Sequence, residues 1–254
     1  MNIQICSNPL AAAKLTAELI ARELAANPRL VLGLATGRTM EGVYRALVHL
    51  HNSQRLDFSR CRTFNLDEYV GLPPEDPQSY HFFMKERLFN RVNINPRHAH
   101  LPDGMSRDLA MECAAYEKKI TDAGGIDLQI LGIGMNGHLG FNEPHSDFDS
   151  RTHVQSLSLA TRMQNAPLFP DPDAMPRRAV TMGVGTIMEA HQCLLLATGR
   201  DKADIVARAF QGPVANSITA SVTQTHPRFT VILDAEAATK LDLTVLNSTG
   251  AAAV

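Results

Sequence analysis

Short apolar runs alternate along the chain with segments whose apolar residues recur at helical spacing. Residues 30–34 form an apolar run of strand length, and a turn containing Thr36 and Gly37 follows it. The next apolar residues, within 40–48, lie three and one positions apart, which places them on one face of a helix. A strand, a glycine-containing turn and an amphipathic helix in this order form the first half of a βαβ unit, which predicts a parallel sheet.

The same alternation continues along the rest of the chain. We expect strands at residues 2–6, 30–34, 62–66, 126–132, 192–197 and 229–233, and helices at 15–24, 40–48, 80–89, 105–120, 179–188 and 202–210. The strands are nearly apolar throughout, as expected where helices cover both faces of a sheet. The sequence therefore predicts the α/β class, with an open, mostly parallel, Rossmann-like sheet in a single domain. That domain should span residues 1–247, and 248–254 should be a frayed tail.

The charge of the chain is nearly balanced, with 24 Lys and Arg against 26 Asp and Glu. A protein that binds nucleic acid regardless of sequence needs a surplus of cations, so no nucleic-acid partner is expected. A small anionic metabolite remains compatible with this balance, because a pocket requires positive charge only locally.

The cysteines and the apolar runs indicate in which cellular compartment the protein is located. The four cysteines are widely spaced and form no CxxC pair, so we expect free thiols in a reducing environment; they are Cys6, Cys61, Cys113 and Cys193. No apolar run reaches the roughly 18 residues of a membrane span, and no signal-like segment precedes the first strand. The expectation is a cytoplasmic protein with no membrane partner.

Polar segments follow four of the predicted strands, at 35–39, 65–69, 132–138 and 198–202. In an open parallel sheet, ligands bind beyond the carboxyl ends of the strands. Convergence of all four segments on one edge would be a stronger sign of a binding site than any one of them alone.

The first of these segments is suited to a phosphate. Backbone N–H groups around Gly37, the hydroxyls of Thr36 and Thr39 and the guanidinium of Arg38 all favour an anion at a helix N-terminus. A βα turn with a threonine N-cap explains the same residues equally well. Lys202 follows a second Thr-Gly turn and could reach the same phosphate, although a solvated lysine in a first helical turn is the simpler interpretation. No Walker A ending is present, so ATP is not implied.

Asp67 and Glu68 are adjacent carboxylates directly after an apolar strand. Neighbours in an extended segment point to opposite faces, so one of the two at most faces a pocket easily. A pocket carboxylate could act as a general base that moves a proton between adjacent carbons. An acidic pair in solvent at a strand end is the alternative.

The glycine-rich segment before His138 is the most informative one. Gly132, Gly134 and Gly137 allow the backbone to pass close to a ligand, and His138 is placed to reach that ligand. Glu143 could orient the imidazole and stabilise its charge. A structural histidine is the competing interpretation, with equal weight.

A metal site is not expected, because no HExxH motif occurs and the cysteines do not cluster with histidines. The irregular, polar and proline-containing stretch at 142–178 is unusual in a compact α/β domain. Long loops of this kind are more often functional than accidental, which predicts a lid.

Two long motifs resemble the glucosamine-6-phosphate deaminase family, within the superfamily that includes the 6-phosphogluconolactonases. They are TFNLDEYVGL at 63–72 and GHLGFNEP at 137–144, and Ser-Arg-Thr at 150–152 and Thr-Arg at 161–162 continue the match in order. The resemblance extends over essentially the whole chain.

The resemblance implies an aldose–ketose isomerisation of an amino-sugar 6-phosphate, coupled to the loss of ammonia. The expected reaction converts glucosamine 6-phosphate and water to fructose 6-phosphate and ammonia. It implies that His138 opens the pyranose ring with support from Glu143 and Asn136, and that Asp67 moves the C2 proton to C1. It also implies that no metal or organic cofactor takes part.

Several positions depart from the family pattern. Asn136 stands where some members carry Asp, so it can hydrogen-bond His138 without holding a countercharge, and ring opening would depend more on Glu143. Met40 stands where a proline is common.

The departures that affect the phosphate are Pro167 and Arg38. Pro167 occupies the position of an arginine that clamps the phosphate in many members, and Arg38 stands where several members have a small residue. We therefore expect Arg38 to replace the missing clamp, together with Lys202 and the two threonines of the first loop.

Other functions remain open at this stage. The substrate could be galactosamine 6-phosphate, and a 6-phosphogluconolactonase or a non-catalytic sugar-phosphate binding protein would share the fold. A sugar-phosphate-sensing regulator would need a DNA-binding segment, for which we expect no room before the first strand. Allosteric members carry basic residues where this chain has His153 and Gln155, so no activation by N-acetylglucosamine 6-phosphate is expected. Whether the chain forms a homo-oligomer is left open.

Overall fold

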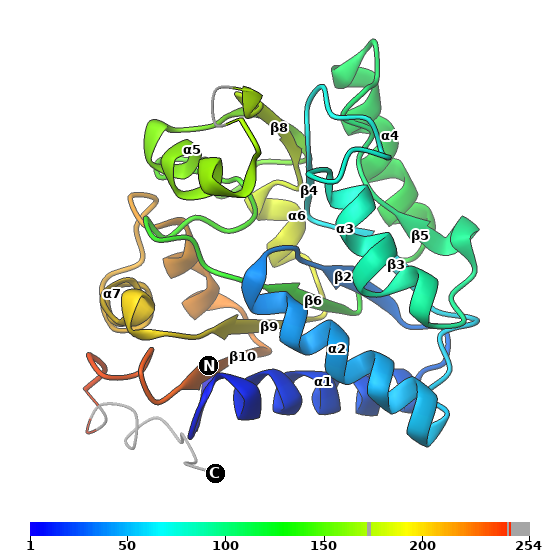
Figure 1. The fold of residues 1–254 in the computed structure, drawn as a ribbon. Coiled ribbons are helices and arrows are strands. Elements are labelled where there is room, and N and C mark those ends of the chain that lie inside the picture. The colour runs from blue at the N-terminus through cyan, green and yellow to red at the C-terminus, as the bar shows by residue number, and fades with distance from the viewer. Residues whose placement is uncertain (172–173, 243, 245–254) are drawn as a thin grey trace.

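A parallel seven-stranded sheet forms the centre of the computed structural model, which describes residues 1–171, 174–242 and 244 (Figure 1). Its strand order is β1-β10-β9-β6-β2-β3-β5, and every neighbouring pair is parallel. The bounds are β1 Asn2–Cys6, β2 Val31–Leu34, β3 Arg62–Asn65, β5 Ala99–His100, β6 Leu128–Leu131, β9 Gln192–Ala197 and β10 Phe229–Asp234. The predicted open parallel sheet is confirmed, and the predicted tail at 248–254 lies outside the described residues.

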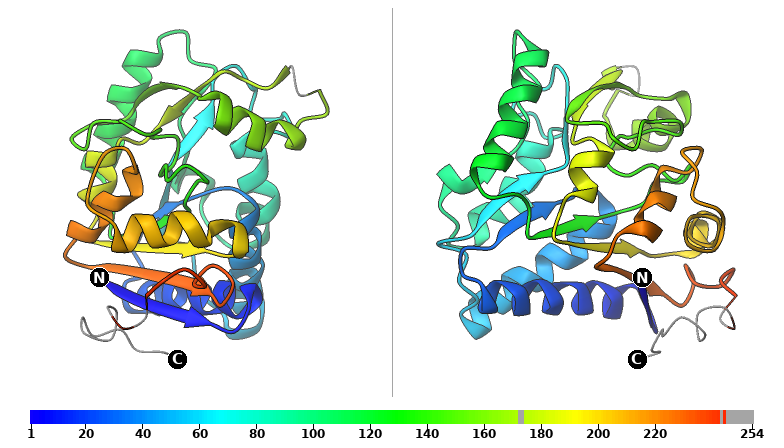
Figure 2. Two further views of the ribbon diagram at one scale, coloured as in Figure 1. Left: turned by 90° about the vertical axis from the view of Figure 1, so that its left-hand side faces the viewer. Right: turned by 180° about the vertical axis from the view of Figure 1, so that it is seen from behind.

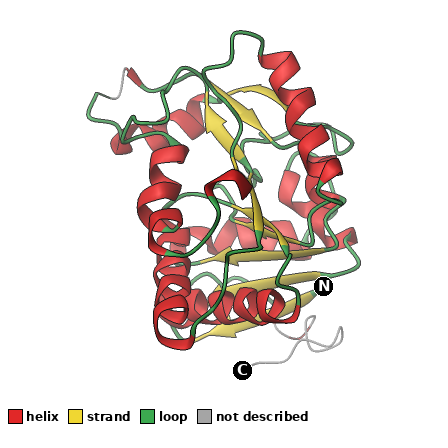
Figure 3. Cartoon of the chain, turned by 90° about the vertical axis from the view of Figure 1, so that its right-hand side faces the viewer, coloured by secondary structure: helices red, strands yellow, loops and turns green. Residues whose placement is uncertain are grey.

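Helices flank the strands on both sides (Figure 3). Crossovers between parallel strands are right-handed, which places α1, α2 and α3 on one face and α4, α6 and α7 on the other. The α-helices are α1 Pro9–Ala26, α2 Arg38–Gln54, α3 Tyr80–Arg87, α4 Leu109–Asp122, α5 Leu159–Asn165, α6 Val184–Met188 and α7 Ala203–Gln211. Short 3₁₀ turns are η1 Phe89–Arg91, η2 Pro96–His98, η3 Ala166–Leu168, η5 Arg200–Lys202 and η6 Thr219–Thr225.

Capping residues fix where two of these helices begin. The Asn8 side chain accepts the backbone N–H of Ala11 at 2.9 Å, and Pro9 occupies the first turn of α1. The Asp108 side chain accepts the N–H of Met111 at 3.0 Å, so α4 begins at residue 109 and not at the predicted 105.

A second, three-stranded antiparallel sheet was not predicted. It has the order β4-β8-β7 and lies beyond one end of the parallel sheet (Figures 1 and 2); its strands are β4 Asp67–Tyr69, β8 Arg178–Thr181 and β7 His153–Ser156. The predicted helix at 179–188 was therefore wrong, because this stretch is β8 followed by α6. The buried residues of the strand and of the following helix are spaced, taken together, like the apolar face of one helix, which explains the wrong prediction. Gly183, the N-cap of α6, separates the strand from the helix. A Cβ at Gly183 would lie 2.2 Å from the backbone oxygen of Ser150.

The order of the strands places a topological switch point between β2 and β6. These neighbours lie where the connections reverse direction, because the chain moves toward one edge after β2 and toward the other after β6. Open α/β sheets bind ligands at such a point, outside the carboxyl ends of the strands. The loops that follow β2 and β6 are therefore placed to form a site.

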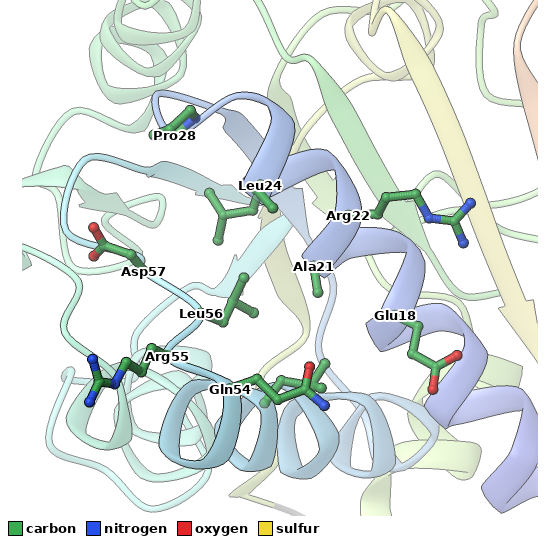
Figure 4. Close-up of a pocket in the computed structure, with 11 residues that line it drawn as sticks. Glu18, Ala21, Arg22, Leu24, Pro28, Gln54, Arg55, Leu56 and Asp57 are labelled. Atoms are coloured by element: carbon green, nitrogen blue, oxygen red, sulfur yellow. The ribbon is translucent and has the colours of Figure 1, made fainter.

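A separate pocket of about 450 Å³ lies at the C-terminal end of α2, between α1 and the connection that follows α2 (Figure 4). Leu24 and Leu56 point into it, and charged side chains such as Arg22 and Asp57 surround it. Because α2 has 17 residues, its two ends are about 25 Å apart, so this pocket is far from the N-terminus of α2.

Among the described helices, none is long and apolar enough to cross a membrane.

Candidate active site

A cavity of about 690 Å³ opens at the carboxyl edge of the parallel sheet. All four polar segments that follow predicted strands contribute to its lining, together with the first turn of α2, residues 140–141, the segment 77–80 that leads into α3, and parts of α3 and α5. Of the candidate site residues singled out from the sequence, the following line it: Thr36, Gly37, Arg38, Thr39, Asp67, Gly132, Gly134, His138 and Lys202. Glu68, Asn136, Gly137 and Glu143 lie outside the lining.

Asp67 stands at the corner where the chain leaves the parallel sheet for the antiparallel one. Leu66, just before it, donates its N–H to Leu34 at 2.9 Å and accepts the N–H of Met182 at 2.7 Å. Asp67 itself pairs with Thr181 in the second sheet, and only 5% of the residue is exposed. The main chain on both sides therefore holds this carboxylate at the cavity wall.

The environment of Asp67 favours its protonated form. Burial, and then the negative charge of Glu68, raise the pKa of Asp67 from 3.8 to about 8. A Cβ added at Gly140 would lie 3.2 Å from Asp67 Oδ2, so the carboxylate packs closely against that glycine. A base with a raised pKa in a cavity is suited to taking a proton from carbon.

Glu68 faces away from the cavity, as the alternation of side chains along an extended segment predicts. It is 1% exposed and binds the beginning of α3. The alternative interpretation, an acidic pair in solvent, is wrong because both carboxylates are buried.

A hydrogen-bonded chain links His138 to Glu143 through Asn136. Asn136 Nδ2 donates to Glu143 Oε2 at 2.8 Å, and Asn136 Oδ1 lies 2.7 Å from His138 Nδ1 and accepts the His138 backbone N–H at 3.2 Å. An ionised carboxylate can only accept, so the amide nitrogen must face Glu143 and the amide oxygen must face the histidine. His138 Nδ1 then carries the proton, which leaves Nε2 as the acceptor.

The electrostatics of this chain keep the imidazole neutral. Burial lowers the pKa of His138 to about 4, Glu143 opposes this shift, and Lys202 adds to it. Burial alone would raise the pKa of Glu143, but hydrogen bonds from Thr161, Ser158 and Asn136 hold it below its ordinary value. His138 is therefore a neutral base, and Glu143 is ionised.

Two glycines of this segment serve the local fold. A Cβ at Gly134 would lie 2.2 Å from the His138 ring, so the ring packs directly over the bare backbone. Gly137 has a φ of +87° and its Cβ would meet Ile218 at 2.7 Å, so only glycine suits this turn. Gly137 thus shapes the loop that carries His138 and does not line the cavity.

The first loop presents the N-terminus of α2 to the cavity. Gly37, with a φ of +103°, is the N-cap and no side chain caps the helix, so the interpretation of a threonine N-cap is wrong. Arg38 and Thr39 follow in the first turn and line the cavity. Backbone N–H groups, hydroxyls and a guanidinium together are suited to an anion.

Lys202 is held at the cavity by its own hydrogen bond. Its Nζ donates to the backbone oxygen of Ile133 at 2.8 Å, and burial lowers its pKa. The interpretation of a solvated lysine is therefore wrong. A cation fixed beside the loop that follows β6 is placed to share an anion with the loop that follows β2.

Further lining residues were not recognised in the sequence. Tyr80 opens α3 and lines the cavity, and Arg87 and Glu41 form an ion pair at 3.3 Å on its wall. Asn165, in α5, also lines it and donates to Tyr69 Oη at 3.2 Å. No sequence pattern marked these residues as part of the site, because each belongs to a helix whose position depends on tertiary packing.

The described residues contain no group of three or more His, Cys, Asp or Glu side chains that could hold a metal ion. All four cysteines are free thiols, as predicted; Cys61, Cys113 and Cys193 are buried and Cys6 is partly buried.

The fold and the cavity define an α/β protein with a buried carboxylate, a neutral histidine and an uncapped helix N-terminus at the switch point of a parallel sheet. The model of the family described as glucosamine-6-phosphate isomerases/6-phosphogluconolactonase matches residues 9–231. The chain belongs to this family.

Similar proteins agree with that assignment. A glucosamine-6-phosphate deaminase of Halothermothrix orenii is 47% identical over 95% of this chain and 100% of its own length. One of Clostridioides difficile is 46% identical over 95% of this chain and 97% of its own length. The solved structure of a monomeric glucosamine-6-phosphate deaminase, 42% identical, covers 94% of this chain and 100% of that chain with a TM-score of 0.93. A 6-phosphogluconolactonase from Trypanosoma cruzi, 22% identical with a TM-score of 0.72 over 93% of this chain and 95% of that chain, shares the fold.

Proposed function

We propose that the chain converts glucosamine 6-phosphate and water to fructose 6-phosphate and ammonia. The observation that carries this proposal is the placement of Asp67 and the neutral His138 in one cavity, with the uncapped N-terminus of α2 beside them. The curated relatives at 47% and 46% identity bear the name of this deaminase.

Ring opening is the first step, and His138 performs it. The sugar phosphate binds at the N-terminus of α2 between Arg38 and Lys202. His138 Nε2 takes the proton of the C1 hydroxyl, the bond from C1 to the ring oxygen breaks, and the protonated imidazole gives the proton to the ring oxygen, which becomes the C5 hydroxyl. Asn136 stabilises the imidazolium by accepting from Nδ1, and Glu143 orients the amide.

Proton transfer and deamination follow in the open chain. Asp67 takes the C2 proton, the electron pair forms the C1–C2 double bond of an enolamine, and the aldehyde oxygen takes a proton from a water molecule to become a hydroxyl. Asp67 returns its proton to C1, and the nitrogen gives a proton back to the hydroxide, which leaves a C2 imine. Water adds to the imine, ammonia leaves, and the C2 ketone of fructose 6-phosphate remains.

Ammonia release from a panel of sugar phosphates tests the proposal. We expect release from glucosamine 6-phosphate by the wild type and its loss in Asp67→Asn. The panel includes galactosamine 6-phosphate, which tests the alternative epimer, and 6-phosphogluconolactone, whose hydrolysis would release acid instead. A wild type that binds these compounds without turning any of them over would be a binding protein, and the proposal would fail.

Arg38 is the expected replacement for the phosphate clamp that Pro167 removes. Arg38→Ala should raise KM for the phosphorylated substrate by roughly tenfold or more with little change in kcat, because a charge-assisted hydrogen bond to the phosphate is lost in both ground and transition states. Arg45→Ala removes the same charge from an exposed position on the same helix and is the control. An unchanged KM for Arg38→Ala would contradict this role.

We also propose one domain over residues 1–247, in which 142–178 acts as a lid. Gln164 and Asn165 in this stretch line the cavity, which supports a role in covering it. The free cysteines support a cytoplasmic location. The oligomeric state is left to measurement, and one structural relative is monomeric.

No activation by N-acetylglucosamine 6-phosphate is expected. His153 Nε2 lies 3.1 Å from Gln155 Oε1, so these positions bind one another and offer no fixed cation to an effector phosphate. Initial rates against substrate concentration should be hyperbolic with and without the effector. A sigmoidal curve that the effector makes hyperbolic would disprove the expectation.

A further inference from the structure

We propose that Glu68 is a positioning residue for the reaction: its buried carboxylate fastens the beginning of α3 to β4, and so holds Tyr80 and Asp67 in their places at the cavity. This inference rests on the proposed function, because it assigns Glu68 a part in the proton transfer that Asp67 performs.

The carboxylate of Glu68 accepts hydrogen bonds from three backbone N–H groups and one side chain. Oε1 accepts the N–H of Tyr69 at 2.8 Å and that of Tyr80 at 3.0 Å. Oε2 accepts the N–H of His81 at 2.9 Å and contacts His81 Nδ1 at 2.8 Å. A residue that is 1% exposed thus has both oxygens satisfied by β4 and by the first turn of α3.

These contacts complete the N-terminus of α3. Helices leave their first N–H groups without partners inside the helix, and a carboxylate near them is also favoured by the helix dipole. Ser79 caps the helix by accepting the N–H of Phe82 at 3.0 Å, while Glu68 takes the N–H groups of Tyr80 and His81. Without Glu68, two part-buried N–H donors would lose their partner and the first turn would loosen.

The first turn of α3 is part of the cavity wall. Ser79 and Tyr80 both line the cavity, and Tyr80 also lies against Tyr69 with ring centroids 5.0 Å apart. Asp67 lies one residue before Glu68 on β4, so the same short strand carries the base and the group that ties down the opposite wall. Displacing this turn would move the wall relative to Asp67.

Glu68 is also the charge that acts on Asp67. Four tyrosines also interact electrostatically with Asp67; they are Tyr44 in α2, Tyr69 in β4, Tyr80 in α3 and Tyr116 in α4. Burial raises the pKa of each of these phenols, so all four are neutral at the pH of an assay. Among the described residues, Glu68 is the charged group that raises the pKa of Asp67 after burial. Removing its charge should lower that pKa.

The Glu68→Gln variant separates positioning from simple stability. We expect kcat to fall roughly ten- to a hundredfold, because small displacements of reacting groups cost that much. We also expect the acidic limb of the kcat/KM profile to move to lower pH. Glu75→Gln, at an exposed carboxylate in the connection between β4 and α3, is the control and should change neither. An acidic limb that stays at the wild-type pH would overturn the proposal, because lost stability alone lowers the amplitude without moving the midpoint.

Hydrogen exchange of the backbone amides in 80–83 tests the fastening without any turnover. These amides should exchange faster in Glu68→Gln than in the wild type and Glu75→Gln, and His81→Phe, which removes one of the four donors, should give a smaller increase. Exchange unchanged in both Glu68→Gln and His81→Phe would overturn the proposal. A wild type that releases no ammonia would instead contradict the proposed function, and the exchange rates would still decide whether Glu68 holds α3.

Discussion

Asp67→Asn should strongly reduce turnover and at the same time make the folded protein more stable at neutral pH. The amide cannot take the C2 proton, so kcat should fall by about 10²- to 10⁴-fold, the usual contribution of a general base. Substrate affinity should survive, because the amide has the same shape and the phosphate contacts are elsewhere in the cavity.

The gain in stability follows from the raised pKa of Asp67. Burial and Glu68 raise this pKa to about 8, from 3.8 for an ordinary aspartate, so between these values the folded state binds more protons than the unfolded state. The stability of the wild type therefore falls as pH rises through this window, because the buried group must either hold a proton or ionise at a cost. The asparagine variant has no such group, so its advantage should be absent below the window and greatest above it.

Thermal midpoints of both proteins, measured from pH 4 to pH 8.5, test this expectation. Asp149→Asn, at an exposed position, is the matched control and should follow the wild type at every pH. A midpoint for Asp67→Asn that equals or falls below the wild type near pH 8 would show that the carboxylate is not strained by its surroundings.

The parallel sheet could be predicted because its information is local. Each of its longer strands is an apolar run next to an amphipathic helix, and the carboxyl-edge rule then places the four polar segments together. The antiparallel sheet could not be predicted in this way. Its strands β4, β7 and β8 are short, and the pair Asp67 and Thr181 joins residues that are far apart in the sequence. The local sequence around either residue does not predict that the two strands pair.

The site shows the same division. Asp67 and His138 could be selected because each follows a strand, and their motifs carry the family resemblance. The roles of Asn136 and Tyr80 depend on contacts that spacing does not reveal. The orientation of the Asn136 amide is fixed by Glu143, seven residues away, and Tyr80 lines the cavity from a helix whose first turn is bound by Glu68.

His138→Gln should separate ring opening from the later proton transfer. Nε2 of the neutral imidazole is the proposed base for the C1 hydroxyl, so kcat/KM for the cyclic substrate should fall by about 10²- to 10⁴-fold. An open-chain analogue, 2-amino-2-deoxyglucitol 6-phosphate, needs no ring opening to bind, and its inhibition constant should change little. Asp67→Asn, which leaves the histidine intact, is the companion variant and should also retain this inhibitor.

The pH profile adds a second criterion for His138. Because burial lowers the pKa of His138 to about 4 while that of Asp67 is about 8, the acidic limb of kcat/KM near neutrality should report Asp67. The residual activity of His138→Gln should therefore keep the wild-type limb, whereas Glu68→Gln should move it. If His138→Gln moved the limb or weakened the open-chain inhibitor as much as the cyclic substrate, the histidine would act on the proton-transfer step, and the division of labour with Asp67 would be wrong.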